Sequence, residues 1–338
     1  MFSAPEQLRA GGDMVFLFDF LARRLAQGIL IVLIVSFGIF AILRMVPGDP
    51  VRMILGPMAN AAAVEAAAQK LGLRDPIPVQ YFHWLGNVVR GDLGNSFSKG
   101  KAGQSSARAD QQSDSDKARV VDLLRGAVPM TLQLAGLALV FTALISVPLG
   151  VAAGLFAGRL PDKVAFYLGS IFVSIPNFWC ALVLVLVVSA QLNLLPSIGY
   201  EGFAYTILPA VVIAIEMSPI FMRALAISIA DVHRQNFVQL ETIRGIGFPR
   251  IFLHHIVRNA TVPILNLFGV QIGALLSGVL IVEYVFNYPG FGLLTVQAVS
   301  QRDFPVIQGA ALLSALLFVV INMLVDLIST WIDPRLDF

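Results

Sequence analysis

Long apolar runs separated by short polar segments dominate the pattern along the chain. Six runs reach the length of about 20 helical residues that crosses about 30 Å of hydrocarbon. They are residues 25–43, 126–158, 164–200, 208–229, 259–282 and 304–325. The first run follows a basic pair, as a signal peptide does, but no small-x-small cleavage site comes after it. The pattern predicts an all-α integral membrane protein with six transmembrane helices.

The composition agrees with a membrane protein. Of the 338 residues, 57% are hydrophobic and 13% are charged, whereas soluble domains carry about a quarter charged residues. The mean hydropathy is +0.80. A net charge of +2 without a basic run gives no basis for nucleic-acid binding. Cys180, the single cysteine, lies in an apolar run, so it cannot form an internal disulfide and is expected to be a buried thiol.

The basic residues of the short loops predict the orientation, because short cytoplasmic loops carry an excess of Lys and Arg. With a cytoplasmic N-terminus, the two short outer loops hold only Arg302 and the inner segments hold eleven basic residues. These are Arg9, Arg23, Arg24, Arg159, Lys163, Arg223, Arg234, Arg244, Arg250, Arg258 and Arg335. We therefore expect a cytoplasmic segment at 1–24, a first helix at 25–44 and a cytoplasmic tail at 333–338.

The region between the first two runs, residues 45–125, is expected to be a long extracytoplasmic loop. It contains a helix-like patch at 61–71 and an aromatic segment at 81–84. Residues 98–119 include no large apolar residue and cannot form a core, so we expect a disordered insert there. The remaining five helices form the core at 126–332.

A polar segment at 231–258 interrupts the core with helical periodicity of its own. Four of its residues recur at spacings of three and four, on one face of a short helix: Phe237, Leu240, Ile243 and Arg244. Gly245 and Gly247 can end that helix, because glycine adopts the left-handed backbone conformation. Pro249 suits the first turn of a second helix. The segment predicts a helix–glycine–helix elbow at the cytoplasmic membrane surface.

The elbow, with Arg258-Asn259-Ala260 and Pro263 after it, resembles the coupling loop of ABC-importer permeases of the dipeptide/oligopeptide/nickel family. The Glu-Ala-Ala that opens the general importer motif is replaced by Gln239, Leu240 and Glu241. Further segments are similar to the family's signatures and occur in its order. They are Val46-Pro47-Gly48-Asp49-Pro50, Gly91-Asp92-Leu93-Gly94 with Ser96, Tyr288-Pro289-Gly290-Phe291-Gly292, Arg302-Asp303-Phe304-Pro305-Val306, and Val325-Asp326-Leu327 with Asp333-Pro334-Arg335.

This resemblance, nearest to the first ("B"-type) peptide permease, implies a type I importer fold in a bacterial inner membrane. It implies a heterodimer with a second permease subunit and an extracytoplasmic solute-binding protein that delivers short peptides or a related solute. Two partner ATPases would bind ATP and Mg, so this chain would be no enzyme and need no cofactor. The family's coupling loop transmits ATPase closure, which here implicates Phe237, Leu240, Glu241, Arg244, Gly245, Gly247, Arg250 and Arg258.

Sites for ATP or a metal are not expected in this chain. A phosphate-binding loop needs four residues between its glycines and Ser or Thr after the lysine. The nearest segment has five residues between Gly94 and Gly100, and Ala102 follows Lys101. The four histidines lack a third ligand at metal-binding spacing: His83, His233, His254 and His255.

Glu216 is an acid inside an apolar run, three residues before Pro219. An ionised carboxylate buried there costs several kcal/mol, and such acids are usually functional. We expect Glu216 and Pro219 on the translocation path, with a helix-packing acid as the alternative. Glu283 and Asp326 fall at the ends of predicted spans, where we expect the interface to solvate them.

The segment around Pro289 indicates a tight turn, because Gly290 and Gly292 follow it. A re-entrant turn and a plain loop are both compatible with the pattern. The resemblance places this turn near the outer mouth. It implies that six residues contact the binding protein: Asp92, Gly290, Phe291, Gly292, Arg302 and Asp303.

Two other functional classes remain as alternatives. A secondary transporter driven by an ion gradient would show internal repeats and broken helices with polar groups at the midplane, and only Glu216 fits that pattern. An intramembrane enzyme would need a nucleophile with a base, or two acids, at membrane depth, and the runs contain no such set.

Overall fold

The computed structural model describes residues 6–45, 60–70, 74–100 and 117–332. Its contacts divide the chain into two units. Unit 1 comprises residues 1–121 and 302–323, and unit 2 comprises residues 122–301 and 324–338. The signatures at 46–50 and 333–335 lie outside the described residues, as does the middle of the insert.

The described residues of unit 1 form helices and one strand pair: α1 (Glu6–Met45), α3 (Ala61–Lys70), α4 (Ile77–Val89), β1 (Asn95–Gly100), β2 (Lys117–Arg119) and the first part of α13 (Phe304–Ile332). Tyr81 of α4 packs on α1, with its ring 5.6 Å from that of Phe40 and its hydroxyl 2.8 Å from Ser36 Oγ. Gly28 lets α1 approach α13, because a side chain there would collide with Val319. The predicted aromatic segment therefore anchors α4 to the first apolar helix.

The strand pair corrects the prediction for the insert. β1 and β2 are antiparallel, with Asn95 opposite Arg119 and Gly100 opposite Lys117. Disorder is therefore wrong for residues 98–100 and 117–119, although residues 101–116 lie outside the described part. These ends need no apolar core, since backbone pairing and bonds to a buried carboxylate hold them.

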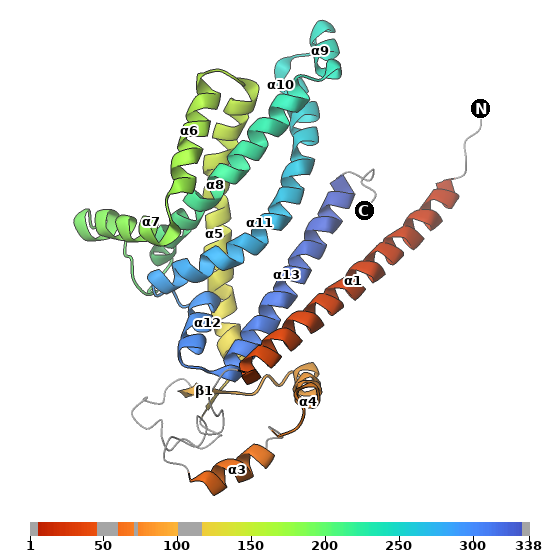
Figure 1. Ribbon diagram of the computed structural model, residues 1–338. Helices are drawn as coiled ribbons and strands as arrows, with labels where there is room; N and C mark the ends of the chain where they lie inside the picture. Colours follow the sequence, from red (N-terminus) through yellow and green to blue (C-terminus); the bar gives the residue numbers. More distant parts are fainter. Residues whose placement is uncertain (1–5, 46–59, 71–73, 101–116, 333–338) are drawn as a thin grey trace. The chain divides into compact units, whose positions relative to one another are not determined.

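In its described residues, unit 2 contains the last part of α13 and ten further helical segments: α5 (Val120–Leu155), α6 (Leu160–Ser174), α7 (Asn177–Leu184), η3 (Val185–Gln191), α8 (Ala204–His233), α9 (Asn236–Ile243), α10 (Phe248–Ile251), η4 (Phe252–Ile256), α11 (Val257–Val285) and α12 (Phe291–Ser300). α8 packs on both α6 and α11 (Figure 1). Small residues on α5 let it approach α8. A Cβ added at Gly154 would lie 2.7 Å from the Cβ of Ile229. Cys180 is buried in the core between these helices, as predicted.

The apolar runs differ in how continuous their helices are. Among the described residues, four helices are long and apolar enough to cross a membrane: Ala22–Met45, Val120–Leu155, Ala204–His233 and Phe304–Ile328. The run predicted at 164–200 bends by 95° between α6 and the helix Asn177–Gln191, and counting this pair as one span gives five. The break falls at Ile175–Pro176, where proline lacks the N–H that would continue the helix.

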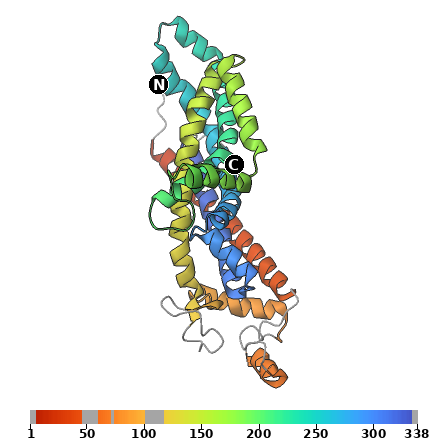
Figure 2. The same cartoon turned by 90° about the vertical axis from the view of Figure 1, so that its left-hand side faces the viewer.

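The connections of unit 2 gather at two opposite ends. One end carries α9 and α10, and the other carries α12 with the turn 286–290 (Figures 1 and 2). α8 and α11 run between them. The predicted elbow and the predicted glycine turn therefore lie at opposite ends of the same helical unit.

Candidate functional site

The elbow has the local structure that its sequence predicts. α9 ends at Ile243, and Gly245 follows with φ +77°. Its N–H donates to the carbonyl of Thr242, at 3.0 Å. Gly247 is the N-cap of α10, and Pro249 lies in the first turn of that helix. The predicted glycine stop and proline start are confirmed.

Apolar and polar contacts attach the elbow to unit 2. Val238, Ile251 and Ile256 are buried in one cluster with residues of α8. The ring of Phe237 lies 6.3 Å from that of His255, and Nε2 of His255 lies 3.3 Å from Oε1 of Glu241. One face of the elbow is therefore held by the unit's own core.

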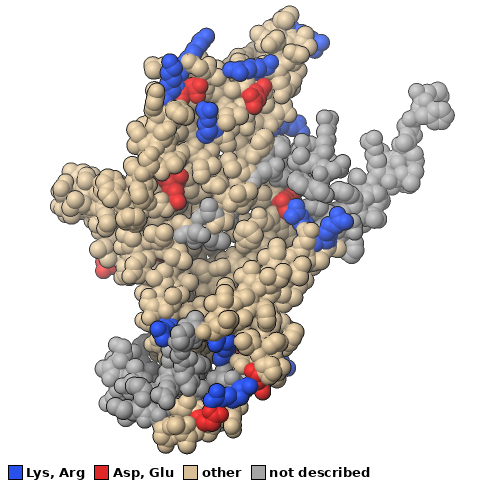
Figure 3. All heavy atoms as spheres, in the orientation of Figure 1, with Lys and Arg blue, Asp and Glu red and all other residues tan. Residues whose placement is uncertain are grey.

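The other face of the elbow exposes large apolar side chains. Ile243 is 81% exposed, and three more residues are at least half exposed: Leu240, Phe248 and Leu253. Arg244, Arg250 and Arg258 are exposed among them. Basic side chains gather at this end of unit 2 in Figure 3. An apolar patch with a basic rim is typical of a protein–protein contact.

Glu216 lies between three helices of unit 2. Its Oε2 accepts a hydrogen bond from Nδ2 of Asn177, the first residue of α7, at 2.5 Å. A Cβ added at Gly278 of α11 would lie 2.9 Å from the same oxygen. The carboxylate is half-buried. Asn177, which the sequence analysis did not single out, is the polar partner that an acid at this depth requires.

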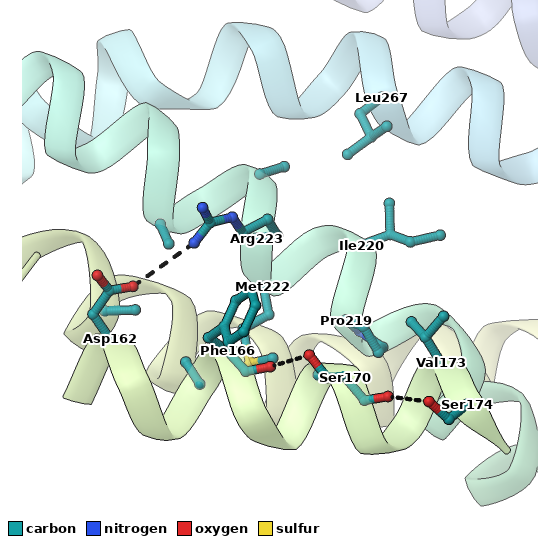
Figure 4. Close-up of a pocket in the computed structure, with 15 residues that line it drawn as sticks. Asp162, Phe166, Ser170, Val173, Ser174, Pro219, Ile220, Met222, Arg223 and Leu267 are labelled. Carbon is teal, nitrogen blue, oxygen red and sulfur yellow. Dashed lines mark hydrogen bonds and ion pairs between the residues drawn. The ribbon is translucent and has the colours of Figure 1, made fainter. Parts of the chain in front are cut away.

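A groove of about 710 Å³ opens between α6 and α8, near the predicted path residue Pro219 (Figure 4). Nη1 of Arg223 lies 3.8 Å from Oδ1 of Asp162, and its guanidinium lies 5.9 Å from the centre of the Phe166 ring. Ser170 and Ser174 also line the groove, and their hydroxyls donate to carbonyls of the preceding turn. The groove is apolar between these few polar groups.

Glu283 is fully buried, so the expectation that the interface solvates it is wrong. Its Oε2 accepts hydrogen bonds from the backbone N–H groups of Gly292 and Leu293, at 2.6 and 3.1 Å. Its Oε1 accepts from Oγ1 of Thr131 on α5, at 2.5 Å, and the same Oγ1 accepts from the N–H of Phe291, at 2.8 Å. The carboxylate and the threonine thus cap the N-terminus of α12, whose free N–H groups favour a negative charge.

The two predicted glycines of this turn provide the space for the carboxylate. A side chain at Gly290 would collide with Glu283, and a Cβ at Gly292 would lie 2.6 Å from the Cα of Leu280. Gly290, Phe291 and Gly292 are all buried. We name Glu283, Thr131, Gly290 and Gly292 the cradle.

The remaining predicted outer-mouth residues belong to unit 1. Asp303 is buried and accepts hydrogen bonds from Oγ of Ser96, and from N and Oγ of Ser98 at 3.0 and 2.7 Å. Burial lowers the pKa of Lys99, and the charge of Asp303 opposes that shift. Asp92 and Arg302 are exposed. Of the six predicted contact residues, these two offer exposed side chains.

No group of three His, Cys, Asp or Glu side chains lies close enough to hold a metal ion within the part of the chain that is described.

Two family models match the chain. One is described as "Binding-protein-dependent transport system inner membrane component" and matches residues 146–338. The other is described as "Binding-prot-dependent transport system membrane comp, N-term" and matches residues 17–135.

Curated relatives match over nearly the whole chain. The "Glutathione transport system permease protein GsiC" of Escherichia coli O6:H1 (strain CFT073) is 32% identical over 320 residues, which cover 95% of this chain and 99% of that protein. The protein of the same name from Salmonella choleraesuis (strain SC-B67) is 31% identical with the same coverage.

Solved structures resemble the fold. Two crystal forms described as inward-facing conformations of the MetNI methionine ABC transporter match with TM-scores of 0.53 and 0.50, at 17% and 16% identity. Each match covers 62% of this chain and 96% of the other. This likeness concerns the fold alone.

Proposed function

Since the chain belongs to the family of binding-protein-dependent transport system inner membrane components and is the permease of an ABC importer, we propose that it carries short peptides or a related small solute. The name of its GsiC relatives, whose cargo glutathione is a tripeptide, supports this choice. The solute passes by alternating access, with the helices moving as rigid bodies around a central path.

The observation that carries the proposed mechanism is the exposed face of the elbow. Ile243, Leu240, Phe248 and Leu253 leave an apolar patch uncovered on a segment that unit 2 holds firmly from its other side. We propose that an ATPase subunit covers this patch and that its ATP-driven closure moves the elbow. Two such ATPases, which bind ATP and Mg, a second permease subunit and a solute-binding protein complete the proposed assembly.

The proposed topology has six spans and both termini in the cytoplasm of a bacterium. α11 provides the sixth span in this proposal, because 29 residues reach about 43 Å at 1.5 Å per residue. Residues 259–282 within it carry no charge. The elbow then faces the cytoplasm, and the turn 286–290 and the strand pair face outward.

Glu216 contributes a negative charge to the proposed path. The replacement Glu216→Gln keeps the shape and leaves the amide of Asn177 a partner, so assembly and ATPase activity should persist. Uptake of cationic solutes should fall more than uptake of neutral ones. Equal changes for both solutes would leave Glu216 only a packing role.

Reconstituted vesicles test the proposal as a whole. Uptake of labelled peptides should require the ATPase subunits, the binding protein and ATP. The ATP must be present on the side of the membrane that carries the ATPases. Omission of the ATPases should abolish it, and an imposed ion gradient should not restore it. Gradient-driven uptake without ATPases would contradict the proposal.

A further inference from the structure

We propose that the groove between α6 and α8 is a binding site for zwitterionic peptides of about three residues. In this site Arg223 holds the peptide's terminal carboxylate, and Glu216 takes its amino group. The inference rests on the proposed import of peptides and identifies the residues that bind the two charged ends of the peptide.

Arg223 is suited to exchange its partner. Its side chain is 56% exposed, and its ion pair with Asp162 is long, at 3.8 Å. Pairs of this kind between exposed groups contribute little to stability. A solute carboxylate can instead form two parallel hydrogen bonds with the guanidinium, which is a stronger arrangement.

Asp162 remains in place when Arg223 binds a solute. Its other oxygen, Oδ2, accepts a hydrogen bond from the N–H of Gly158 at 2.8 Å. The acid is therefore fixed at the start of α6 independently of Arg223. It can take the guanidinium back when the solute leaves, which makes the site reversible.

The spacing along α8 sets the length of the solute. Glu216, Ile220 and Arg223 follow one another at intervals of four and three, so they lie on one face of the helix. Ile220 and Arg223 line the groove. The same spacing puts Glu216 on their side of α8, one turn before Ile220, where its carboxylate meets Asn177. Seven residues at 1.5 Å each separate the two charges by about 10 Å along the helix. Three extended residues of a peptide span about the same distance.

The rest of the groove fits a peptide of that size. Val173 and Leu267 offer apolar contact. Ser170 and Ser174 also line the groove, and their hydroxyl oxygens can accept hydrogen bonds while they donate to carbonyls of the preceding turn. Its volume of about 710 Å³ lies within the range of small-molecule sites. Asn177 orients the carboxylate of Glu216 from the side of α7.

Uptake by the complete transporter tests the charge assignment. A tripeptide and its C-terminal amide are compared in wild type, Arg223→Gln and the control Lys163→Gln, with the same binding protein throughout. We expect Arg223→Gln to lower uptake of the free acid by about tenfold and to leave the amide unchanged. Lys163→Gln should change neither. Equal effects on acid and amide would overturn the inference while leaving ATP-dependent peptide uptake intact.

A second measurement tests the occupant directly, even where no peptide is transported. Ser170→Cys is made in a Cys180→Ala background, and the assembled complex is treated with a water-soluble thiol reagent. We expect rapid labelling that the tripeptide slows and its amide does not. Absence of labelling would show that lipid or a partner helix covers the groove. Labelling that the tripeptide does not slow would show that the groove is open to water but does not bind the peptide. Either result would overturn the proposal.

Discussion

The two ends of unit 2 differ in what they bury and what they expose. At the α12 end, a charged group is buried, and every hydrogen bond to Glu283 comes from Thr131 or from the backbone of α12. At the elbow end, apolar side chains such as Ile243 are exposed, and the polar contact between Glu241 and His255 lies near the surface. The first end is completed by the chain itself. The second offers a surface that another protein can cover.

This difference has a physical basis in what each contact costs to break. Removal of one partner from a buried charge network leaves polar groups without water and is strongly destabilising. A pair near the surface exchanges its bonds with water at little cost. We therefore expect changes in the cradle to affect folding, and changes in the elbow to affect coupling.

The replacement Glu283→Ala should have the largest effect. It leaves the N–H groups of Gly292 and Leu293 and the hydroxyl of Thr131 buried without their acceptor, at about 1–3 kcal/mol each. We expect loss of the folded permease, measured as yield and thermal unfolding in detergent. The exposed Glu201→Ala is the matched control and should behave as wild type. A stable Glu283→Ala protein would contradict the importance of the cradle.

Thr131→Val should give the next largest effect. Valine has the shape of threonine but lacks the hydroxyl that links Glu283 to the N–H of Phe291, which costs about 1–3 kcal/mol. The unfolding temperature should fall, whereas Thr131→Ser should keep most of the stability. Equal behaviour of the two variants would show that packing, and not the hydrogen bonds, accounts for the residue.

Gly245→Val should leave the fold intact and impair coupling. Its φ of +77° costs about 1–2 kcal/mol for a residue with a side chain, and the strain is confined to the elbow. We expect assembled complex, persistent ATP hydrolysis and uptake lowered by about tenfold. Gly247→Ala is the control, since its φ of −64° suits any residue. Wild-type uptake by Gly245→Val would contradict the proposed role of the elbow in coupling.

Shortening the insert by half within residues 101–116 should have the smallest effect. Halving a loop changes its closure free energy by only about 0.6 kcal/mol. The strand ends remain attached through Ser98 and Asp303. Transport and thermal stability should stay within error of wild type, and external protease should cut there first. Loss of binding-protein-stimulated ATPase activity would instead identify the insert as a docking element.

The sequence by itself determined the apolar runs, the elbow and the family. These features depend on residues close together in the chain, since hydrophobic periodicity, a glycine stop and a proline start act within a few residues. The helices found at α5, α8 and α13 and the φ of Gly245 follow from such local rules. The run expected at 164–200 is instead bent at Pro176 and ends as a helix at Gln191.

Tertiary structure alone decided where the acids lie. Thr131 and Glu283 are 152 positions apart, and Ser96 and Asp303 are 207 apart, so no local pattern pairs them. The sequence around an acid at the end of an apolar run is the same whether water solvates the carboxylate or the N–H groups of a helix N-terminus donate hydrogen bonds to it. The choice depends on which element folds back over it, because a buried carboxylate is stable only where donors converge from distant segments.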